Sequence, residues 1–314
     1  MKTNLMEVIR KLSSLGERQG KMADKSAQYI MSILKKEKLL FSLHFFNNYI
    51  PKTEKVWLKA DGKNIKCEGC SFVSGKITGK DSIVSSLISS QPLIEKSNIN
   101  FNPECDTTSR SNFYFAPAVA INKKDLSHVV KAKKVEGLVR VRKTKVRSQH
   151  ILIGNTKNPE NIIFTHFDSI GPGAIDNASG VAVVLGAIIS KPKSLDKNLY
   201  VFDGNEELSY DFPVYWGHGF RVFEKKYFKI MNNAKKIIVP DCLGYGKTFS
   251  ITDPKIVKLA FPISNIERWK NKIQILGGDI ETLMRVYHSS FDTVNSLNER
   301  DLWLAVQKLL NITK

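Results

Sequence analysis

The sequence lacks any long hydrophobic run. Its longest apolar stretch, VAVVLGAII at residues 181–189, is about half of the roughly 20 residues that a membrane-spanning helix needs. The residues after Lys2 contain no apolar core of the length, about 7–15 residues, that is typical of a secretory signal. We therefore expect a cytoplasmic protein with no membrane partner.

Cysteine is scarce. The four copies, Cys67, Cys70, Cys105 and Cys242, make a disulfide framework unexpected in a chain of 314 residues without a signal. Cys67 and Cys70 have the spacing of half a zinc ribbon, but neither a second cysteine pair nor a histidine pair follows. A tight turn that holds two thiols is therefore favoured over a structural zinc site.

Acidic residues are few relative to basic ones, at 30 against 48, so the formal charge is +18. The excess is uneven: residues 1–150 carry 28 basic and 13 acidic residues, a net of +15. A basic surface can bind nucleic acid or an anionic membrane. However, residues 139–147 alternate valine with Arg or Lys, which indicates a strand with a solvated basic face, and this strand has no aromatic side chains for bases to stack on. We therefore do not expect a nucleic-acid partner, and self-association stays open.

The pattern of the chain predicts an α/β protein with an insert. Residues 4–37 have helical periodicity that Gly16 and Gly20 interrupt, which predicts two helices. Short β-branched runs between turn signals then give way to alternating strands and helices, which build a mixed, mostly parallel sheet covered by helices on both faces. We divide the chain into N-terminal helices that pack on the main domain (1–40), a small β-rich insert (41–135) and the main domain itself (136–314). In the last part the predicted strands are 151–155, 162–166, 199–204, 236–241 and 284–288, and the predicted helices are 181–190, 221–233 and 299–312.

Five short segments each end an apolar run with side chains that bind metals. Ligands in open α/β sheets sit beyond the carboxyl ends of the strands, and four of these segments end a predicted strand. Two imidazoles and several carboxylates are the set that a pair of divalent cations needs, and the absence of cysteine favours Zn²⁺, with Co²⁺ or Mn²⁺ as alternatives. The seven candidates are His166, Asp168, Asp176, Glu206, Glu207, Asp241 and His288.

Each of these residues alone has an ordinary explanation. His166 resembles a structural strand-end histidine, and Asp176 a helix N-cap. The adjacent acids Glu206 and Glu207 repel each other unless a cation or a shared proton compensates, so one could bind a metal while the other handles protons. Asp168 could accept the second N–H of His166, and Asp176 could bridge two cations with its two oxygens.

The order and content of these motifs resemble a known family. HFDS (166–169), GPGAIDNASGVA (171–182), VFDGNEE (201–207), VPDCLG (239–244) and YHSSFDT (287–293) look like the successive motifs of the M28 zinc peptidases, which share a fold with glutaminyl cyclases. Residues 12–34 also resemble the leading helix pair of that family. Residues 115–142 are similar to the end of the protease-associated insert that many members carry.

The resemblance implies metal-dependent hydrolysis of peptides, with removal of N-terminal residues favoured. One metal would be held by His166 and Glu207 and the other by Asp241 and His288, with Asp176 as the bridge. The resemblance also implies a cis peptide bond between Asp176 and Asn177.

The remaining implied roles concern catalysis by a water that two zinc ions activate. Glu206 would be the general base and Asp168 would orient His166. Tyr287 would hydrogen-bond the substrate carbonyl, although an ordinary structural aromatic is an equal alternative. The segments after Glu207 and after Asp241 differ in length from the family pattern. Trp216 and His218 either line the pocket there or pack the enlarged loop, and packing is favoured.

Two other functions stay open. FDGNEELSYDFPVYWG (202–217) is similar to a string in glutaminyl cyclases, which use a single zinc ion, whereas the DNASG segment (176–180) fits the peptidases better. A non-catalytic binding protein on the same fold is disfavoured because all five metal-ligand positions are retained.

Overall fold

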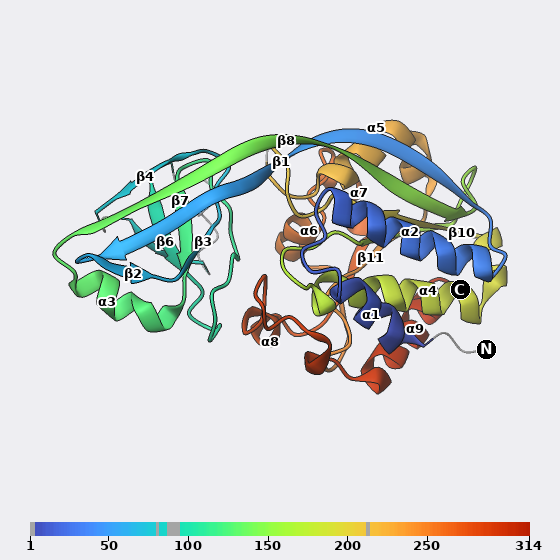
Figure 1. The fold of residues 1–314 in the computed structure, drawn as a ribbon. Coiled ribbons are helices and arrows are strands. Elements are labelled where there is room, and N and C mark those ends of the chain that lie inside the picture. The colour runs from blue at the N-terminus through green and yellow to red at the C-terminus, as the bar shows by residue number, and fades with distance from the viewer. Residues whose placement is uncertain (1–3, 80–81, 87–94, 212–213) are drawn as a thin grey trace.

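Two long antiparallel strands join the two parts of the molecule. The computed structural model describes residues 4–79, 82–86, 95–211 and 214–314. Strands β1 (Phe41–Ala60) and β8 (Val135–Gly154) pair along their length and extend from an α/β body to a smaller β-rich part (Figure 1). The chain thus passes between the two parts within strands and not through a flexible linker. In the described ranges, no helix is long and apolar enough to cross a membrane.

The sheet of the body is mixed, with parallel strands at its centre. Its nine strands run in the order β12-β13-β11-β9-β10-β8-β1-β2, and β4 also pairs with β8. Strands β13, β11, β9 and β10 are parallel to one another, whereas β12 and β8 flank them in antiparallel orientation. The remaining bounds are β2 (Lys63–Ile65), β4 (Gly75–Thr78), β9 (Asn161–His166), β10 (Asn198–Asp203), β11 (Lys236–Pro240), β12 (Phe249–Ile251) and β13 (Ile273–Gly277).

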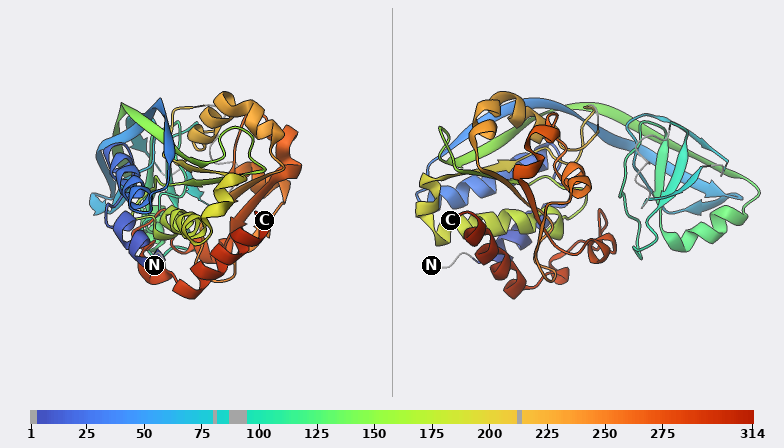
Figure 2. Two further views of the ribbon diagram at one scale, coloured as in Figure 1. Left: turned by 90° about the vertical axis from the view of Figure 1, so that its right-hand side faces the viewer. Right: turned by 180° about the vertical axis from the view of Figure 1, so that it is seen from behind.

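Helices cover both faces of this sheet because its central strands are apolar on both sides. In β10, Tyr200 and Phe202 pack on one face, while Leu199 and Val201 pack on the other. The first face is covered by α1 (Leu5–Ser13), α2 (Lys21–Lys36), α4 (Gly180–Ser190) and α9 (Glu299–Ile312). The second face is covered by α5 (His218–Asn233), α6 (Pro254–Ala260) and α7 (Ile266–Trp269) (Figure 2). The predicted fold class is therefore confirmed.

The β-rich part has its own four-stranded sheet, in the order β3-β7-β6-β5. Its remaining elements are β3 (Cys67–Gly69), β5 (Ile83–Ser85), β6 (Asn98–Phe101), β7 (Ala118–Ile121) and α3 (Leu126–Lys131). Cys70 is buried there, and the side-chain amide of Asn100 donates to its sulfur at 3.0 Å. No cysteine belongs to a converging group of metal donors among the described residues.

The predicted strand at residues 284–288 is wrong. The structure has helix α8 (Ile280–Met284) followed by a turn, and the side chain of Asp279 caps the helix by accepting the N–H of Thr282 at 2.9 Å. Strand β13 already has β11 and β12 as neighbours on its two sides, so it offers no free edge to a further strand. His288 therefore reaches the site from a turn with φ of 50° and not from the end of a strand.

Replacement of Gly186 by leucine tests the packing of α4. A Cβ atom at this buried position would lie 2.8 Å from Leu5 Cδ2 in α1 and 3.1 Å from Val306 Cγ2 in α9, which leaves no room for the rest of the side chain. We expect the free energy of unfolding to fall by about 1–3 kcal/mol in urea denaturation. The control is Ser190→Leu at the exposed end of the same helix, and an equal loss in both variants would contradict this packing.

Candidate metal centre

Three neighbouring strands bring the candidate residues to one edge of the sheet. Strand β9 ends at His166, β10 is followed by Glu206 and Glu207, and β11 is followed by Asp241. Because β10 and β11 lie on either side of β9 and run parallel to it, their carboxyl ends meet at the same edge. Asp176, in the loop before α4, and His288 complete the cluster.

Asp176 faces both imidazoles. Its Oδ1 lies 3.3 Å from Nε2 of His166, and its Oδ2 lies 3.2 Å from Nε2 of His288. All three side chains are almost fully buried. The two carboxylate oxygens of Asp176 thus point toward two separate groups of donors, which is the arrangement that a bridging ligand needs.

The remaining acids divide between these two groups. Nε2 of His166 lies 3.5 Å from Asp241 Oδ1, and Nε2 of His288 lies 3.0 Å from Glu207 Oε2. The donors of His166, Asp176 and Asp241 converge within 4.8 Å, as do those of Asp176, Glu207 and His288. The family resemblance implied His166 with Glu207 and Asp241 with His288, whereas these two groups join His166 with Asp241 and Glu207 with His288. Strand order could not decide between the pairings, because β9 lies between β10 and β11.

A third group places the proposed base beside the same histidine. Donors of His166, Glu206 and Glu207 also converge within 4.8 Å. Glu206 is more exposed than Glu207. Burial and the neighbouring charge of Glu207 raise the pKa of the Glu206 carboxyl well above its ordinary value, although the charge of His166 opposes this shift. Because its side chain is partly exposed, Glu206 lies at the open side of the cluster.

The charges of the cluster suit divalent cations. Burial raises the pKa of Glu207 to about 7, against the opposing charge of His288. Burial opposes a charge on His288, but Glu207 and Asp176 raise its pKa to about 10. Glu207 Oε1 is buried without a hydrogen-bond partner, whereas His288 Nε2 faces the carboxylates of Glu207 and Asp176. Buried charges are costly unless they are paired or bind a metal, and the donor set of imidazole and carboxylate fits Zn²⁺.

Asp168 has a wider role than the predicted orientation of His166. Nδ1 of His166 lies 3.2 Å from the Asp168 carbonyl oxygen and 3.4 Å from its Oδ1. The two carboxylate oxygens also accept the backbone N–H groups of Glu206 and Glu207, each at 3.0 Å. One buried carboxylate thereby links the end of β9 to the turn that carries both glutamates.

Asp292 and Asn177 hold the loop of Asp176. Asp292 accepts the backbone N–H groups of Ile175 and Asp176 at 2.6 and 3.1 Å. The peptide bond between Asp176 and Asn177 is cis, as the resemblance implied. The side chain of Asn177 donates to the Pro240 carbonyl at 3.1 Å, which ties this loop to the end of β11. Asp292 lies in the YHSSFDT motif (287–293), which was a sequence signal for this residue. The motif alone did not predict its hydrogen bonds to the loop of Asp176.

Arg18 is a residue of the site that sequence reasoning missed. It lies between α1 and α2, is fully buried, and donates to the carbonyl oxygens of Phe167, Pro172 and Gly173 at 2.6–2.9 Å. Burial lowers its pKa to about 10, against the opposing effect of Asp292 and Asp168. The N-terminal helices thus brace the segment that links His166 to Asp176. An arginine in a polar stretch gives no sequence signal of such burial.

The aromatic candidates have mixed outcomes. The ring of Tyr287 stacks on His288 with centroids 3.7 Å apart, next to the cluster. Trp216 donates its indole N–H to the Leu259 carbonyl at 2.8 Å, and His218 Nδ1 lies 2.9 Å from Asp211 Oδ2. Trp216 thus contacts α6 and His218 contacts the enlarged loop, which agrees with the packing that the sequence favoured.

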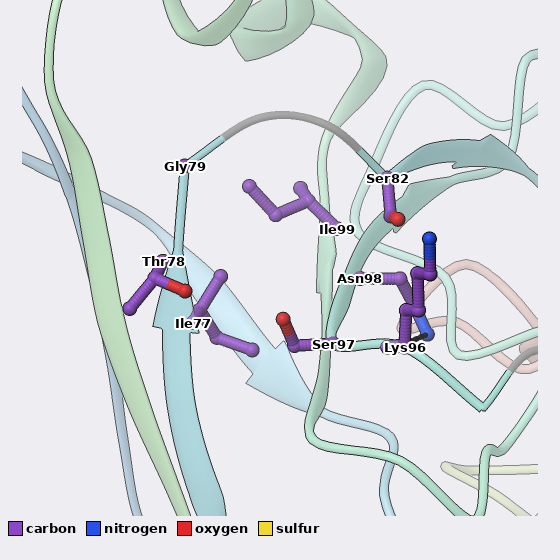
Figure 3. Close-up of a pocket in the computed structure, with 8 residues that line it drawn as sticks. All are labelled: Ile77, Thr78, Gly79, Ser82, Lys96, Ser97, Asn98 and Ile99. Carbon is purple, nitrogen blue, oxygen red and sulfur yellow. Dashed lines mark hydrogen bonds between the residues drawn. The ribbon is translucent and has the colours of Figure 1, made fainter.

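A separate pocket lies in the β-rich part. It has a volume of about 320 Å³ and is lined by residues of β4, β6 and their neighbouring loops, among them Ile77, Lys96 and Asn98 (Figure 3). None of its lining residues belongs to the metal-binding cluster. This pocket therefore forms no part of the candidate centre.

Comparisons with known proteins agree with this fold. Residues 150–208 match the model of peptidase family M28, which confirms the resemblance that the motifs indicated. No curated protein matches the sequence.

Solved structures share the fold. A zinc aminopeptidase from Bacillus subtilis is 16% identical, with a TM-score of 0.68 over 98% of this chain and 92% of that one. A peptidase M28 precursor from Shewanella amazonensis is 13% identical, with a TM-score of 0.67 over the same shares. A glutaminyl cyclase from Bacteroides thetaiotaomicron is 11% identical, with a TM-score of 0.53 over 99% of this chain and 96% of that one.

Replacement of Arg18 by methionine tests the brace. The variant keeps most of the side-chain volume but leaves buried carbonyl oxygens without donors, at a cost of about 1–3 kcal/mol for each such group. We expect a lower free energy of unfolding in urea and weaker binding of Zn²⁺ in calorimetry. Arg10→Met on the exposed side of α1 is the control, and wild-type stability of Arg18→Met would exclude the brace.

The raised pKa values of the histidines predict proton release on metal binding. At pH 7 the metal-free protein holds a proton on His288, whose pKa is about 10, and the pKa of His166 is also raised because Asp168, Asp176 and Asp241 overcome the effect of its burial. A cation needs the neutral imidazole, so its binding expels these protons and its affinity rises with pH. Calorimetry in buffers of different ionisation enthalpy measures this release. Equal apparent enthalpies in all buffers would contradict the prediction.

Proposed function

We propose that this protein is a peptidase of family M28 that hydrolyses peptide bonds with two divalent cations, for which Zn²⁺ is favoured, and that it removes residues from the N-terminus of peptides. The observation that carries the proposal is the placement of Asp176. Its two oxygens face His166 in one group of donors and His288 in the other. This arrangement supports two ions better than one.

The five ligands divide between the two proposed ions. His166 and Asp241 would hold one ion, Glu207 and His288 the other, and Asp176 would contribute one oxygen to each. When bound, such cations polarise the scissile carbonyl group and make water more acidic. Asp168 accepts the backbone N–H groups of the two glutamates and thereby holds them at this edge of the sheet.

Glu206 is the proposed general base. Burial raises its pKa, which strengthens the carboxylate as a proton acceptor. As the oxygen of water attacks the carbonyl carbon, Glu206 takes a proton from that water. It then gives the proton to the amide nitrogen, the C–N bond breaks, and the amine leaves.

Tyr287 is proposed to stabilise the oxyanion that forms during this attack. Its ring stacks on His288, and burial together with Asp176 and Glu207 raises its pKa well above the ordinary value. The hydroxyl group therefore keeps its proton and can donate a hydrogen bond to a developing negative charge.

The charge of the site supports recognition of an N-terminus. Among the described residues, the carboxylates of the cluster form ion pairs with histidines alone. The buried guanidinium group of Arg18 donates its hydrogen bonds to three backbone carbonyl oxygens. In the described ranges no arginine or lysine forms an ion pair with these carboxylates, and the α-ammonium group of a peptide suits such an acidic edge.

Replacement of Glu206 by glutamine tests the mechanism. Glutamine keeps the shape of the side chain but cannot accept the proton, so kcat should fall by about 10²–10⁴-fold while zinc binding persists. Hydrolysis of a panel of aminoacyl chromogenic substrates, with and without chelator, measures activity, and elemental analysis measures zinc. Glu37→Gln at the exposed end of α2 is the control.

Several outcomes would contradict the proposal. Wild-type turnover by Glu206→Gln would exclude this residue as the base. One tightly bound zinc ion per chain, together with cyclisation of N-terminal glutaminyl peptides, would favour the cyclase alternative. Cleavage of peptides whose N-terminus is blocked would exclude N-terminal specificity.

A further inference from the structure

The β-rich part of the chain contacts the turn that carries His288. Ser109 forms an isolated antiparallel bridge with Ser289, and its hydroxyl group donates to the carbonyl oxygen of Tyr287 at 2.6 Å. The side-chain amide of Asn102 donates to the carbonyl oxygen of Met284 at 2.8 Å. Ser109 and Asn102 are both buried. A loop of the insert is therefore bonded to the backbone on both sides of His288.

Arg110 lies at the centre of this contact. Its backbone N–H donates to the carbonyl oxygen of His288 at 3.0 Å, and its own carbonyl oxygen lies 3.2 Å from Nδ1 of His288. A carbonyl oxygen can only accept, so Nδ1 must carry the proton. In the neutral imidazole that a cation needs, Nε2, which faces Asp176 and Glu207, is then the nitrogen with the free lone pair.

The side chain of Arg110 fixes this loop to the body. Its guanidinium group forms a close ion pair with Glu17, between α1 and α2, and a second ion pair with Glu68 in β3 at 3.2 Å. The Arg110 side chain is 16% exposed. Glu17 directly precedes Arg18, which braces the segment between His166 and Asp176. The guanidinium group thus connects the insert to the same N-terminal loop that supports the other half of the centre.

His288 needs such support because of its backbone. Its φ of 50° lies in the left-handed region, which residues other than glycine seldom occupy unless neighbouring contacts hold them there. The turn follows a short helix and belongs to no strand of the sheet. Contacts from the insert therefore supply the order that a strand would otherwise provide.

We infer that Arg110 is a positioning residue of the metal centre, through which the β-rich insert sets the tautomer and orientation of His288. The inference rests on the proposed function. A group that orients a metal-binding histidine typically changes metal affinity by about 10–100-fold when it is removed. Arg110 contacts His288 through its backbone, which Arg110→Ala keeps, and its side chain holds that backbone in place through the ion pairs with Glu17 and Glu68. Loss of the side chain should therefore weaken binding of the ion at His288 and spare the ion at His166.

Metal titration of Arg110→Ala tests this asymmetry. The metal-free protein is titrated with Zn²⁺ by calorimetry against a competing chelator, and with Co²⁺ by visible absorption. We expect two ions in the wild type. In the variant, one ion should keep its affinity and the other should bind about 10–100-fold more weakly. Arg142→Ala is the matched control, because Arg142 is an exposed arginine of β8 whose partner is Glu54, and both ions should then bind as in the wild type.

Two milder variants separate positioning from general loss of structure. Arg110→Lys and Glu17→Gln each keep part of the ion-pair network. The affinity for the same ion should therefore fall, but by less than in Arg110→Ala. Thermal unfolding of the metal-free proteins checks their folding. If Arg110→Ala does not fold, these two variants decide the question.

The outcomes distinguish this inference from the proposed function. Wild-type affinity for both ions in all three variants, or equal weakening of both, would overturn the role of Arg110 and leave the two-ion site intact. If the wild-type protein does not bind two ions, the proposed function is wrong, and so is the inferred role of Arg110.

Discussion

Asp176 is the residue on which the arrangement of the site depends. Its carboxylate is buried between two imidazoles that come from distant segments of the sequence, at 3.3 and 3.2 Å. Four other carboxylates crowd the same edge of the sheet, and like charges at this distance in a buried setting are costly unless cations compensate. The histidines of the protein therefore compensate only part of the negative charge at this site.

Backbone contacts keep these charges in place. Asp168 accepts the N–H groups of both glutamates, and Asp292 accepts those of Ile175 and Asp176. Arg18 donates to the carbonyl oxygens of the segment between the first histidine and Asp176. Each contact joins segments that are distant in the sequence, so the positions of Asp176 and of the two glutamates depend on a second part of the chain.

The insert contributes to this support and is more than an appended module. Strands β1 and β8 connect it to the body, and its loop around Arg110 returns to the turn of His288. Aromatic side chains add a second area of contact, since Phe72 and Phe113 of the insert pack against Tyr215, which lies shortly after the two glutamates. The insert, the loop after β10 and the turn of His288 therefore meet at the same edge.

The sequence by itself determined the strands β9, β10 and β11, the helices α4, α5 and α9, and which residues gather at the carboxyl ends of those strands. These features follow from local patterns: helix 299–312 matches its apolar periodicity, and the ends of β9, β10 and β11 carry His166, Glu206, Glu207 and Asp241. Only the tertiary structure decided which acid faces which histidine, that residues 284–288 form a turn, and that Arg18 and Arg110 support the centre. These outcomes depend on contacts between residues far apart in the chain, such as the 178 positions between Arg110 and His288. No local periodicity records such contacts, because they arise from the packing of one folded segment against another.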